Sequence, residues 1–344
     1  MTDELVPHRG VARFLDEAFG PAGGDVVVER LGEGHSNLTF LVRRGEDAWV
    51  LRRPPRGDIL PGTHEMSREF AVMKAIAEAG MAVPVPRPIA LCDDDRYLGA
   101  PFYLMSYVEG VVVRGAYPPE LDEPTHRREA GFELVDKLAD IHAIDWRAIG
   151  LESLARKPEQ FLARNLRRMQ ELYDAVKHRD VPEIEEAGAW LHEHAPEQRE
   201  VSLTHGDYKL DNVILGRRPP ARIAAVVDWE ISTIGDPLVD LGWLLYFSPD
   251  DGETSVAPMP AADGYPTRAE AANRYAQRTG RPLDDLRFYT AFAGWKIAII
   301  MEGSNFRFKQ GMADDDMFSA LDVGVPALAK RALDIISGAA PVGA

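Results

Sequence analysis

The sequence predicts an α+β protein of two lobes, an N-terminal antiparallel sheet with one helix and a larger, mostly helical C-terminal lobe. Two observations lead to this prediction. The 344 residues exceed what one small core needs and suit two lobes. Short β-branched runs separated by turns dominate up to residue 108, whereas apolar residues recur at helical spacing from residue 109 onward. We therefore expect an N-terminal lobe over residues 1–108 and a helical C-terminal lobe over residues 109–344.

Composition narrows the class of protein and its partners. The hydrophobic content of 45% and the charged content of 27% are ordinary for a globular protein, and a net charge of −16 argues against a nucleic-acid surface. The acidic N-terminus lacks the pattern of a signal peptide, and no apolar run is long enough to cross a membrane. Cys92, the single cysteine, cannot form an internal disulfide. We expect a cytoplasmic monomer or homodimer that binds neither membranes nor nucleic acid.

The N-terminal lobe is expected to begin with a packing helix followed by an antiparallel meander. Apolar residues recur at helical spacing over residues 9–19, and Gly20-Pro21 ends the pattern. Three β-branched runs follow, and a Gly-containing turn joins the last two. These strands are expected over residues 26–31, 38–43 and 48–52.

A small-residue loop and two charged residues in this lobe suit phosphate binding. Residues 32–37 read Gly-Glu-Gly-His-Ser-Asn, so their backbone amides can approach a phosphate, although such a turn alone usually marks only a hairpin. Arg52 ends the third strand, where its side chain can reach phosphates held by the loop. A helix expected over residues 63–79 carries Glu69 near its middle, and this carboxylate can pair with Arg52.

Two more strands and then a series of helices complete the predicted chain. Residues 93–95 are most simply an exposed turn between two strand-like runs. His142 lies near an apolar helical face, where a structural histidine is the simpler interpretation. Pro237 suits the first turn of a helix that Asp236 caps. The remaining strands are expected over 89–92 and 101–108, and further helices near 158–176, 182–195, 268–279, 283–301 and 318–336.

The stretch from residue 203 to residue 230 concentrates polar groups between apolar runs. Residues 213–215 and 223–227 read as two short buried strands joined by a Pro-Pro turn. This hairpin presents Asp207 and Asn212 at its entrance and Asp228 at its exit. Two carboxylates and an amide suit Mg²⁺ in phosphate chemistry, because Mg²⁺ takes one or two protein carboxylates and fills its other positions with phosphate and water.

Taken in order, these parts resemble the kinase fold. The small-residue loop, the strand-end cation, the helical Glu, residues 205–207 (His-Gly-Asp), Asn212 and Asp228 follow the kinase arrangement. More narrowly, they are similar to the aminoglycoside phosphotransferase and choline-kinase-like family, which has His-Gly-Asp where protein kinases have His-Arg-Asp. The resemblance covers residues 30–245 by motif. The segments that look closest to the kinase-like domains associated with acyl-CoA dehydrogenases are 36–40, 50–55 and 205–212.

The resemblance implies transfer of a phosphoryl group from ATP, with Mg²⁺, to a hydroxyl group of a small molecule. Asp207 matches the carboxylate that accepts or orients the hydroxyl proton, and Lys209 matches a lysine that contacts the transferred group. Asn212 and Asp228 match the Mg²⁺ ligands. Asp240 matches the aspartate that hydrogen-bonds backbone amides of the catalytic loop.

The same resemblance assigns the nucleotide to the N-terminal lobe. The glycine loop would hold phosphates, and the segment that matches the interlobe linker would meet adenine through backbone groups. The residues expected to bind the nucleotide are Gly34, Ser36, Asn37, Arg52, Glu69, Ser106, Tyr107 and Val108.

One departure from the family pattern leaves other functions open. Arg52 stands where kinases have lysine, and a planar guanidinium does not replace an ammonium neutrally. The alternatives are a catalytically weak nucleotide-binding regulatory module and a metal-dependent hydrolase that uses His205, Asp207 and Asp228. The resemblance favours a hydroxyacyl-CoA or hydroxy acid over an aminoglycoside as acceptor, and basic groups mildly favour an anion. The residues expected to shape the acceptor site are Trp295, Lys296, Asn305, Arg307 and Lys309, with Arg164, Arg167 and Arg168 as a solvated helix face or an alternative anion site.

Overall fold

The computed structural model describes residues 5–32, 37–55, 66–248, 263–312, 316–340 and 342. The chain divides into two compact units. The first unit comprises residues 1–110 and 224–232, and the second comprises residues 111–223 and 233–344. Residues 224–232 thus group with the first unit, although they follow the second unit's first segment in the sequence.

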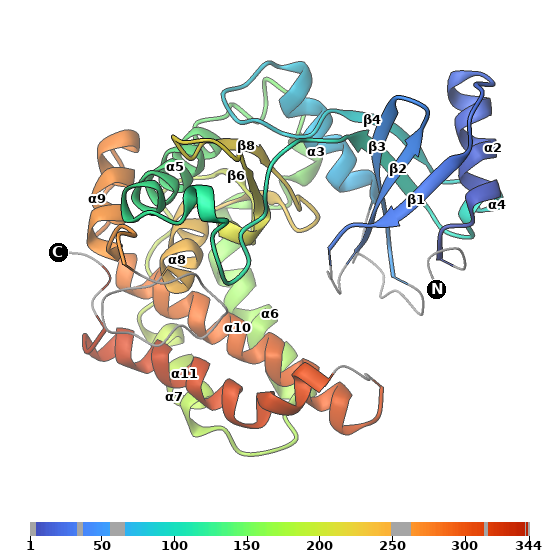
Figure 1. The fold of residues 1–344 in the computed structure, drawn as a ribbon. Coiled ribbons are helices and arrows are strands. Elements are labelled where there is room, and N and C mark those ends of the chain that lie inside the picture. The colour runs from blue at the N-terminus through green and yellow to red at the C-terminus, as the bar shows by residue number, and fades with distance from the viewer. Residues whose placement is uncertain are drawn as a thin grey trace. The chain divides into compact units, whose positions relative to one another are not determined.

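The first unit is built on a five-stranded sheet with the order β1-β2-β3-β5-β4 (Figure 1). Every neighbouring pair is antiparallel, as the predicted meander requires. The strands alternate with turns whose glycines adopt positive φ, such as Gly45 in the β2–β3 turn. The strand bounds are β1 Val26–Arg30, β2 Leu38–Arg44, β3 Asp47–Arg53, β4 Pro88–Cys92 and β5 Phe102–Ser106.

Helices of the first unit cover the sheet. Helix α2 (His8–Phe19) buries Val11, Phe14 and Leu15 in the same apolar cluster as Leu51 of β3. Side chains alternate along a strand, so Arg52 points to the opposite face from Leu51. Helix α3 (Met66–Glu78) packs against β4 and β5. Residues 93–95 are exposed as expected, and the short helix α4 (Asp95–Leu98) begins at the last of them, where the Asp94 side chain caps it by accepting from the Arg96 amide.

The second unit is mainly helical and contains two small antiparallel ladders. Strand β6 (Ser202–Thr204) pairs with β9 (Thr233–Gly235), and β7 (Val213–Leu215) pairs with β8 (Ile223–Val226), the strand in which the chain passes into the first unit. The sequence analysis predicted the β7–β8 pair and missed β6 and β9. The helices are α5 Pro124–His142, α6 Phe161–Val176, α7 Pro182–Glu193, α8 Pro237–Phe247, α9 Arg268–Thr279, α10 Leu286–Lys309 and α11 Leu321–Ser337.

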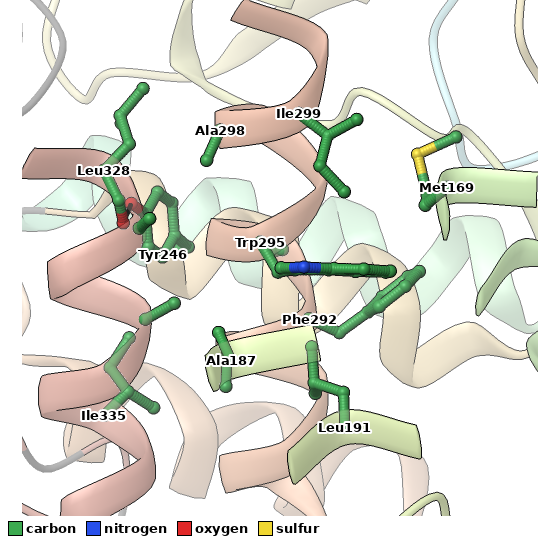
Figure 2. Packing of buried hydrophobic residues seen from close by; sticks show 14 of the residues in the cluster. Met169, Ala187, Leu191, Tyr246, Phe292, Trp295, Ala298, Ile299, Leu328 and Ile335 are labelled. Atoms are coloured by element: carbon green, nitrogen blue, oxygen red, sulfur yellow. Dashed lines mark hydrogen bonds between the residues drawn. The ribbon is translucent and has the colours of Figure 1, made fainter. Parts of the chain in front are cut away.

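Aromatic and aliphatic side chains from five of these helices form the core of the second unit (Figure 2). Trp295 of α10 is fully buried, packs beside Phe292 and donates from Nε1 to the Ile184 carbonyl oxygen at 2.9 Å. Gly188 of α7 lies against the Trp295 ring, where an added Cβ would come within 3.0 Å. Trp295 therefore belongs to the core, and the expectation that it shapes the acceptor site is wrong.

Candidate functional site

In the first unit, Arg52 lies between two acidic side chains. Its Nε is 3.1 Å from Glu69 Oε2, and its terminal Nη2 donates to Asp228 Oδ1 at 2.5 Å. The expected ion pair between Arg52 of β3 and Glu69 of α3 is therefore present. Glu69 is 1% exposed. Burial raises the pKa of Glu69 while Arg52 pulls it down, and the net shift is upward.

The chain around Asp228 is held in an unusual backbone conformation. Asp228 has φ +70°, a region that few residues other than glycine adopt. Two hydrogen bonds of Trp229 support it: the backbone amide donates to Glu69 Oε1 at 3.2 Å, and Nε1 donates to the Val226 carbonyl oxygen at 3.1 Å. Glu69 thus fixes both Arg52 and the segment that carries Asp228.

The other predicted nucleotide-binding residues differ in their surroundings. Gly34 and Ser36 lie outside the described residues. Asn37 is buried, and its Nδ2 donates to Glu230 Oε2 at 2.8 Å. Ser106 ends β5 and exchanges hydrogen bonds with the backbone of Arg87. The remaining two, in the segment after β5, are the half-exposed Tyr107 and the partly buried Val108.

In the second unit, three side chains hold the carboxylate of Asp207. Trp243 of α8 donates from Nε1 to Oδ1 at 2.8 Å, and Asn212 donates from Nδ2 to Oδ2 at 2.8 Å. Lys209 Nζ lies 3.3 Å from the same Oδ2. Both carboxylate oxygens therefore have a fixed donor, which orients the group.

Lys209 is shared between two carboxylates. Its Nζ also donates to Asp211 at 2.9 Å. Burial alone would lower the pKa of Lys209, but Asp207 and Asp211 together raise it. Lys209 is a charged neighbour of Asp207 whose own charge is already compensated.

Asp240 anchors the backbone next to Asp207. This fully buried carboxylate accepts from the amides of His205 at 2.6 Å and Gly206 at 2.8 Å, as expected from the sequence. It also accepts from His142 Nε2 at 3.3 Å, so His142 Nδ1 is free to accept from Tyr275. Burial raises the pKa of Asp240, but hydrogen bonds led by that of His142 outweigh it and lower the pKa. His142 has the structural role that its apolar face suggested.

The two residues predicted as metal ligands each keep an oxygen suited to Mg²⁺. Asn212 uses both protons of its amide nitrogen on Asp207, which leaves its side-chain oxygen as an acceptor that no described residue occupies. Asp228 gives Oδ1 to Arg52, and no described residue donates to its Oδ2. An amide oxygen and a carboxylate oxygen are ligands that Mg²⁺ accepts, so both side chains fit the ion.

Two residues near Asp207 were missed or only loosely placed by the sequence. We had assigned Trp243 to an apolar helix, although it follows Asp240 by three residues, a spacing that puts both on one face of α8. Lys296 of α10 was expected to shape the acceptor site, and the sequence did not indicate which groups it contacts. Its Nζ donates to the Gly206 carbonyl oxygen at 3.3 Å and lies 4.5 Å from the centre of the Trp243 ring.

Most of the remaining polar residues predicted near the acceptor bond to neighbouring groups of the second unit. Lys309 Nζ lies 2.6 Å from Asp322, and Asn305 donates to the same carboxylate. Arg307 donates to Ser304. On α6 the three arginines differ: Arg164 bonds the carbonyl oxygens of residues 156 and 157, Arg167 pairs with Glu171 at 3.6 Å, and Arg168 is exposed.

Residues 27–274 match the model of the phosphotransferase enzyme family. This chain belongs to that family. The matched span contains Arg52, Asp207 and Asp228. The family assignment confirms the resemblance seen in the sequence.

Curated relatives of this phosphotransferase-family chain are named as acyl-CoA dehydrogenases or members of that family. Acyl-CoA dehydrogenase family member 10 of Mus musculus is 34% identical over an alignment of 320 residues, which covers 90% of this chain and 29% of that protein. Acyl-CoA dehydrogenase family member 11 of Gallus gallus is 34% identical over 92% of this chain and 41% of that protein. The chain thus spans less than half of the curated relatives that it matches.

Solved structures confirm the predicted α+β fold of this phosphotransferase-family chain. A structure from Ralstonia eutropha, described as a candidate aminoglycoside phosphotransferase, has a TM-score of 0.80 at 30% identity and covers 96% of this chain and 98% of its own. The GDP complex of aminoglycoside 2'-phosphotransferase-IIIa has a TM-score of 0.61 at 15% identity, and the match covers 94% of this chain and 99% of that one. A choline/ethanolamine kinase family protein from Mesorhizobium loti has a TM-score of 0.58 at 21% identity, covering 95% and 94%.

Helix composition also bears on membranes. Within the described ranges, no helix combines the length and apolar character that crossing a bilayer requires.

Proposed function

We propose that this chain is an ATP- and Mg²⁺-dependent phosphotransferase that phosphorylates a hydroxyl group of a small molecule. The observation that carries the proposal is the held carboxylate of Asp207, in a chain that belongs to the phosphotransferase enzyme family. In this role Asp207 receives the hydroxyl proton of the acceptor as the phosphoryl group is transferred. Its two donors keep one orientation, so little reorganisation is needed at the moment of reaction.

Asn212 and Asp228 are the residues that would hold Mg²⁺. When bound, the ion would neutralise charge on the phosphates of the nucleotide. The two side chains contribute one neutral and one charged oxygen. Lys209 balances the negative charge beside Asp207 and, in this proposal, contacts the transferred group.

Arg52 and Glu69 would orient the nucleotide phosphates from the first unit. Kinases need a strand cation paired with a helical glutamate, and Arg52 meets Glu69 at 3.1 Å in the same arrangement. Asn37, Gly34 and Ser36 are proposed to line the phosphates, and the segment 106–108 to meet adenine.

A hydroxyacyl-CoA or hydroxy acid is the proposed acceptor class. Support comes from relatives named as acyl-CoA dehydrogenase family members, of which this chain matches 29–44% of the length. In such relatives, a segment that phosphorylates a hydroxyacyl compound could act on the same class of compound as an acyl-CoA dehydrogenase segment of the same chain. Aminoglycosides remain the comparison substrates, because structural neighbours carry that name.

The proposal is tested by incubating the protein with γ-labelled ATP, Mg²⁺ and a metabolite pool that includes hydroxyacyl-CoAs, hydroxy acids and aminoglycosides. We expect label on a hydroxyacyl compound and none with Asp207→Asn, which keeps the size of the side chain but cannot accept the proton. Mg·ATP binding to this variant, measured by calorimetry, should persist. Full turnover by Asp207→Asn would remove Asp207 from the proposed role.

A nucleotide-binding regulatory module is the second candidate, and the arginine at position 52 favours it. Arg52→Lys distinguishes the two functions. Measurable turnover in the wild type, with little change or a rise in the variant, supports a kinase. Nucleotide binding without phosphoryl transfer in both proteins supports the regulatory module.

A further inference from the structure

Lys296 is a cation beside the proposed catalytic carboxylate that lacks an acidic partner. Its ammonium group donates to the carbonyl oxygen of Gly206, the residue before Asp207, and lies over the ring of Trp243. Trp243 in turn donates to Asp207 Oδ1. Lys296 and Asp207 therefore flank the same two groups, a peptide carbonyl and an indole ring.

The ammonium group of Lys296 makes fewer hydrogen bonds to described residues than it has donors. It carries three N–H donors, and one carbonyl oxygen accepts from it at 3.3 Å. No carboxylate of a described residue lies within ion-pair distance of it. Burial lowers the pKa of Lys296 and outweighs the opposing effect of the Asp207 and Asp240 charges, neither of which lies within ion-pair distance.

The other nearby cations differ from Lys296 in their ion pairs and their exposure. Lys209 is compensated by Asp207 and Asp211. Arg168 of α6 is exposed and forms no ion pair with a described residue, and its charge also lowers the pKa of Lys296. In a chain with a net charge of −16, a largely buried ammonium group that has no ion-pair partner among the described residues, next to Asp207, indicates a negative or strongly electronegative ligand group.

We propose that Lys296 is an acceptor-binding residue whose ammonium group donates to the acyl oxygen of a hydroxyacyl acceptor, while the hydroxyl group of that acceptor meets Asp207. This inference rests on the proposed function and adds to it the residue that recognises the acyl end. The acyl oxygen belongs either to the carboxylate of a free hydroxy acid or to the carbonyl of a thioester. Both accept a hydrogen bond from the ammonium group, and a neutral diol offers no such oxygen.

Labelling of Lys296 tests occupancy without requiring catalysis. The wild-type protein is treated with a water-soluble amine-reactive ester, and modification of each lysine is read by peptide mass spectrometry. The probes are hydroxybutyrate, hydroxyhexanoate and hydroxydecanoate, their CoA thioesters, and matched neutral diols. We expect acyl probes to slow modification of Lys296 and diols to leave it unchanged, while Lys309 on the same helix is unaffected by either.

The pattern of protection separates the two sources of the acyl oxygen. Protection by the free acids assigns the carboxylate, and protection by thioesters alone assigns the thioester carbonyl. No protection of Lys296 by any acyl probe, or equal protection by the diols, overturns the proposal.

Kinetics of Lys296→Met supply a second test, with Lys309→Met as the matched control. The Lys296 variant should raise the KM for the acceptor about 10-fold to 100-fold, the loss expected for one hydrogen bond to a charged group. The KM for ATP should change less than the KM for the acceptor, and Lys296→Arg should recover part of the loss. A lower kcat with an unchanged acceptor KM contradicts acceptor binding.

The two proposals can fail separately. If the wild type phosphorylates no compound, the proposed function falls, and the labelling result still decides whether Lys296 binds an acyl group. If the wild type phosphorylates a hydroxyacyl compound but Lys296 is neither protected nor needed for acceptor affinity, only the inference about Lys296 falls.

Discussion

Replacing Arg52 with methionine should destabilise the first unit, because the buried Glu69 would lose its cationic partner and would have to stay ionised alone or take up a proton. Arg52 is 7% exposed and Glu69 is 1% exposed, so water can do little to compensate for the lost contact. Removing one partner of a buried ion pair costs about 3–5 kcal/mol. Most of this cost should come from Glu69, since the Asp228 side chain is 24% exposed and can be hydrated.

A double-mutant cycle measures the interaction itself. Glu69→Gln combined with Arg52→Met removes both charges, so the double variant should be more stable than the sum of the single losses implies, by about 2 kcal/mol. Chemical unfolding followed by tryptophan fluorescence gives the free energies, and Trp49 and Trp229 of the first unit report on it. Additive losses would show that Arg52 and Glu69 do not interact.

The pH dependence of the same variant follows from Glu69. Burial raises its folded-state pKa, and loss of Arg52 removes the main opposing effect, so the pKa rises further in Arg52→Met. A carboxyl whose folded pKa exceeds its unfolded pKa contributes stability at low pH and loses it as pH rises. The stability gap between wild type and variant should therefore be nearly constant at low pH and should widen as pH rises through about 7, the folded-state pKa of Glu69 in the wild type. A gap that narrows as pH rises through this value would refute the assignment.

Three further changes test other parts of the structure. Trp243→Phe removes the donor to Asp207 Oδ1 and should lower kcat about 10-fold or more with little change in the KM for ATP; an unchanged kcat would show that this hydrogen bond does not position the carboxylate. Thr267→Ala breaks the capping box at the start of α9 and should cost about 1 kcal/mol in urea unfolding, a loss that serine should largely restore. Gly242→Ala would place a Cβ 2.5 Å from the backbone of Tyr289, so we expect a loss of about 1–3 kcal/mol or failure to fold, and wild-type stability would contradict this close packing.

Local sequence signals were sufficient for most of the sheet and for several helices. The run 38–43 became β2 Leu38–Arg44, and 268–279 became α9 Arg268–Thr279, because alternation and capping residues act within a few positions. Strands β6 and β9 were missed since each has only three residues and depends on a partner about thirty positions away. Strand β7 is equally short but was predicted, because its partner β8 follows in the same hairpin.

The site shows the same division between local motifs and distant contacts. Asp207, Asn212 and Asp240 could be identified because their spacing follows a recognisable motif. Trp295 was placed wrongly and Trp243 was overlooked, because a tryptophan in an apolar helix looks the same whether its ring meets the core or a carboxylate. Only the packing of α10 and α8 distinguishes the two.

Residues 224–232 have a consequence for how this chain can be divided. The backbone crosses from one unit to the other after Gly110, Ile223 and Ser232, so neither unit is a continuous piece of sequence. A fragment cut at residue 110 would lose Asp228, the salt-bridge partner of Arg52, along with the amide that bonds Glu69. Fusion proteins, domain swaps and expression trials should therefore keep residues of both units together in one chain.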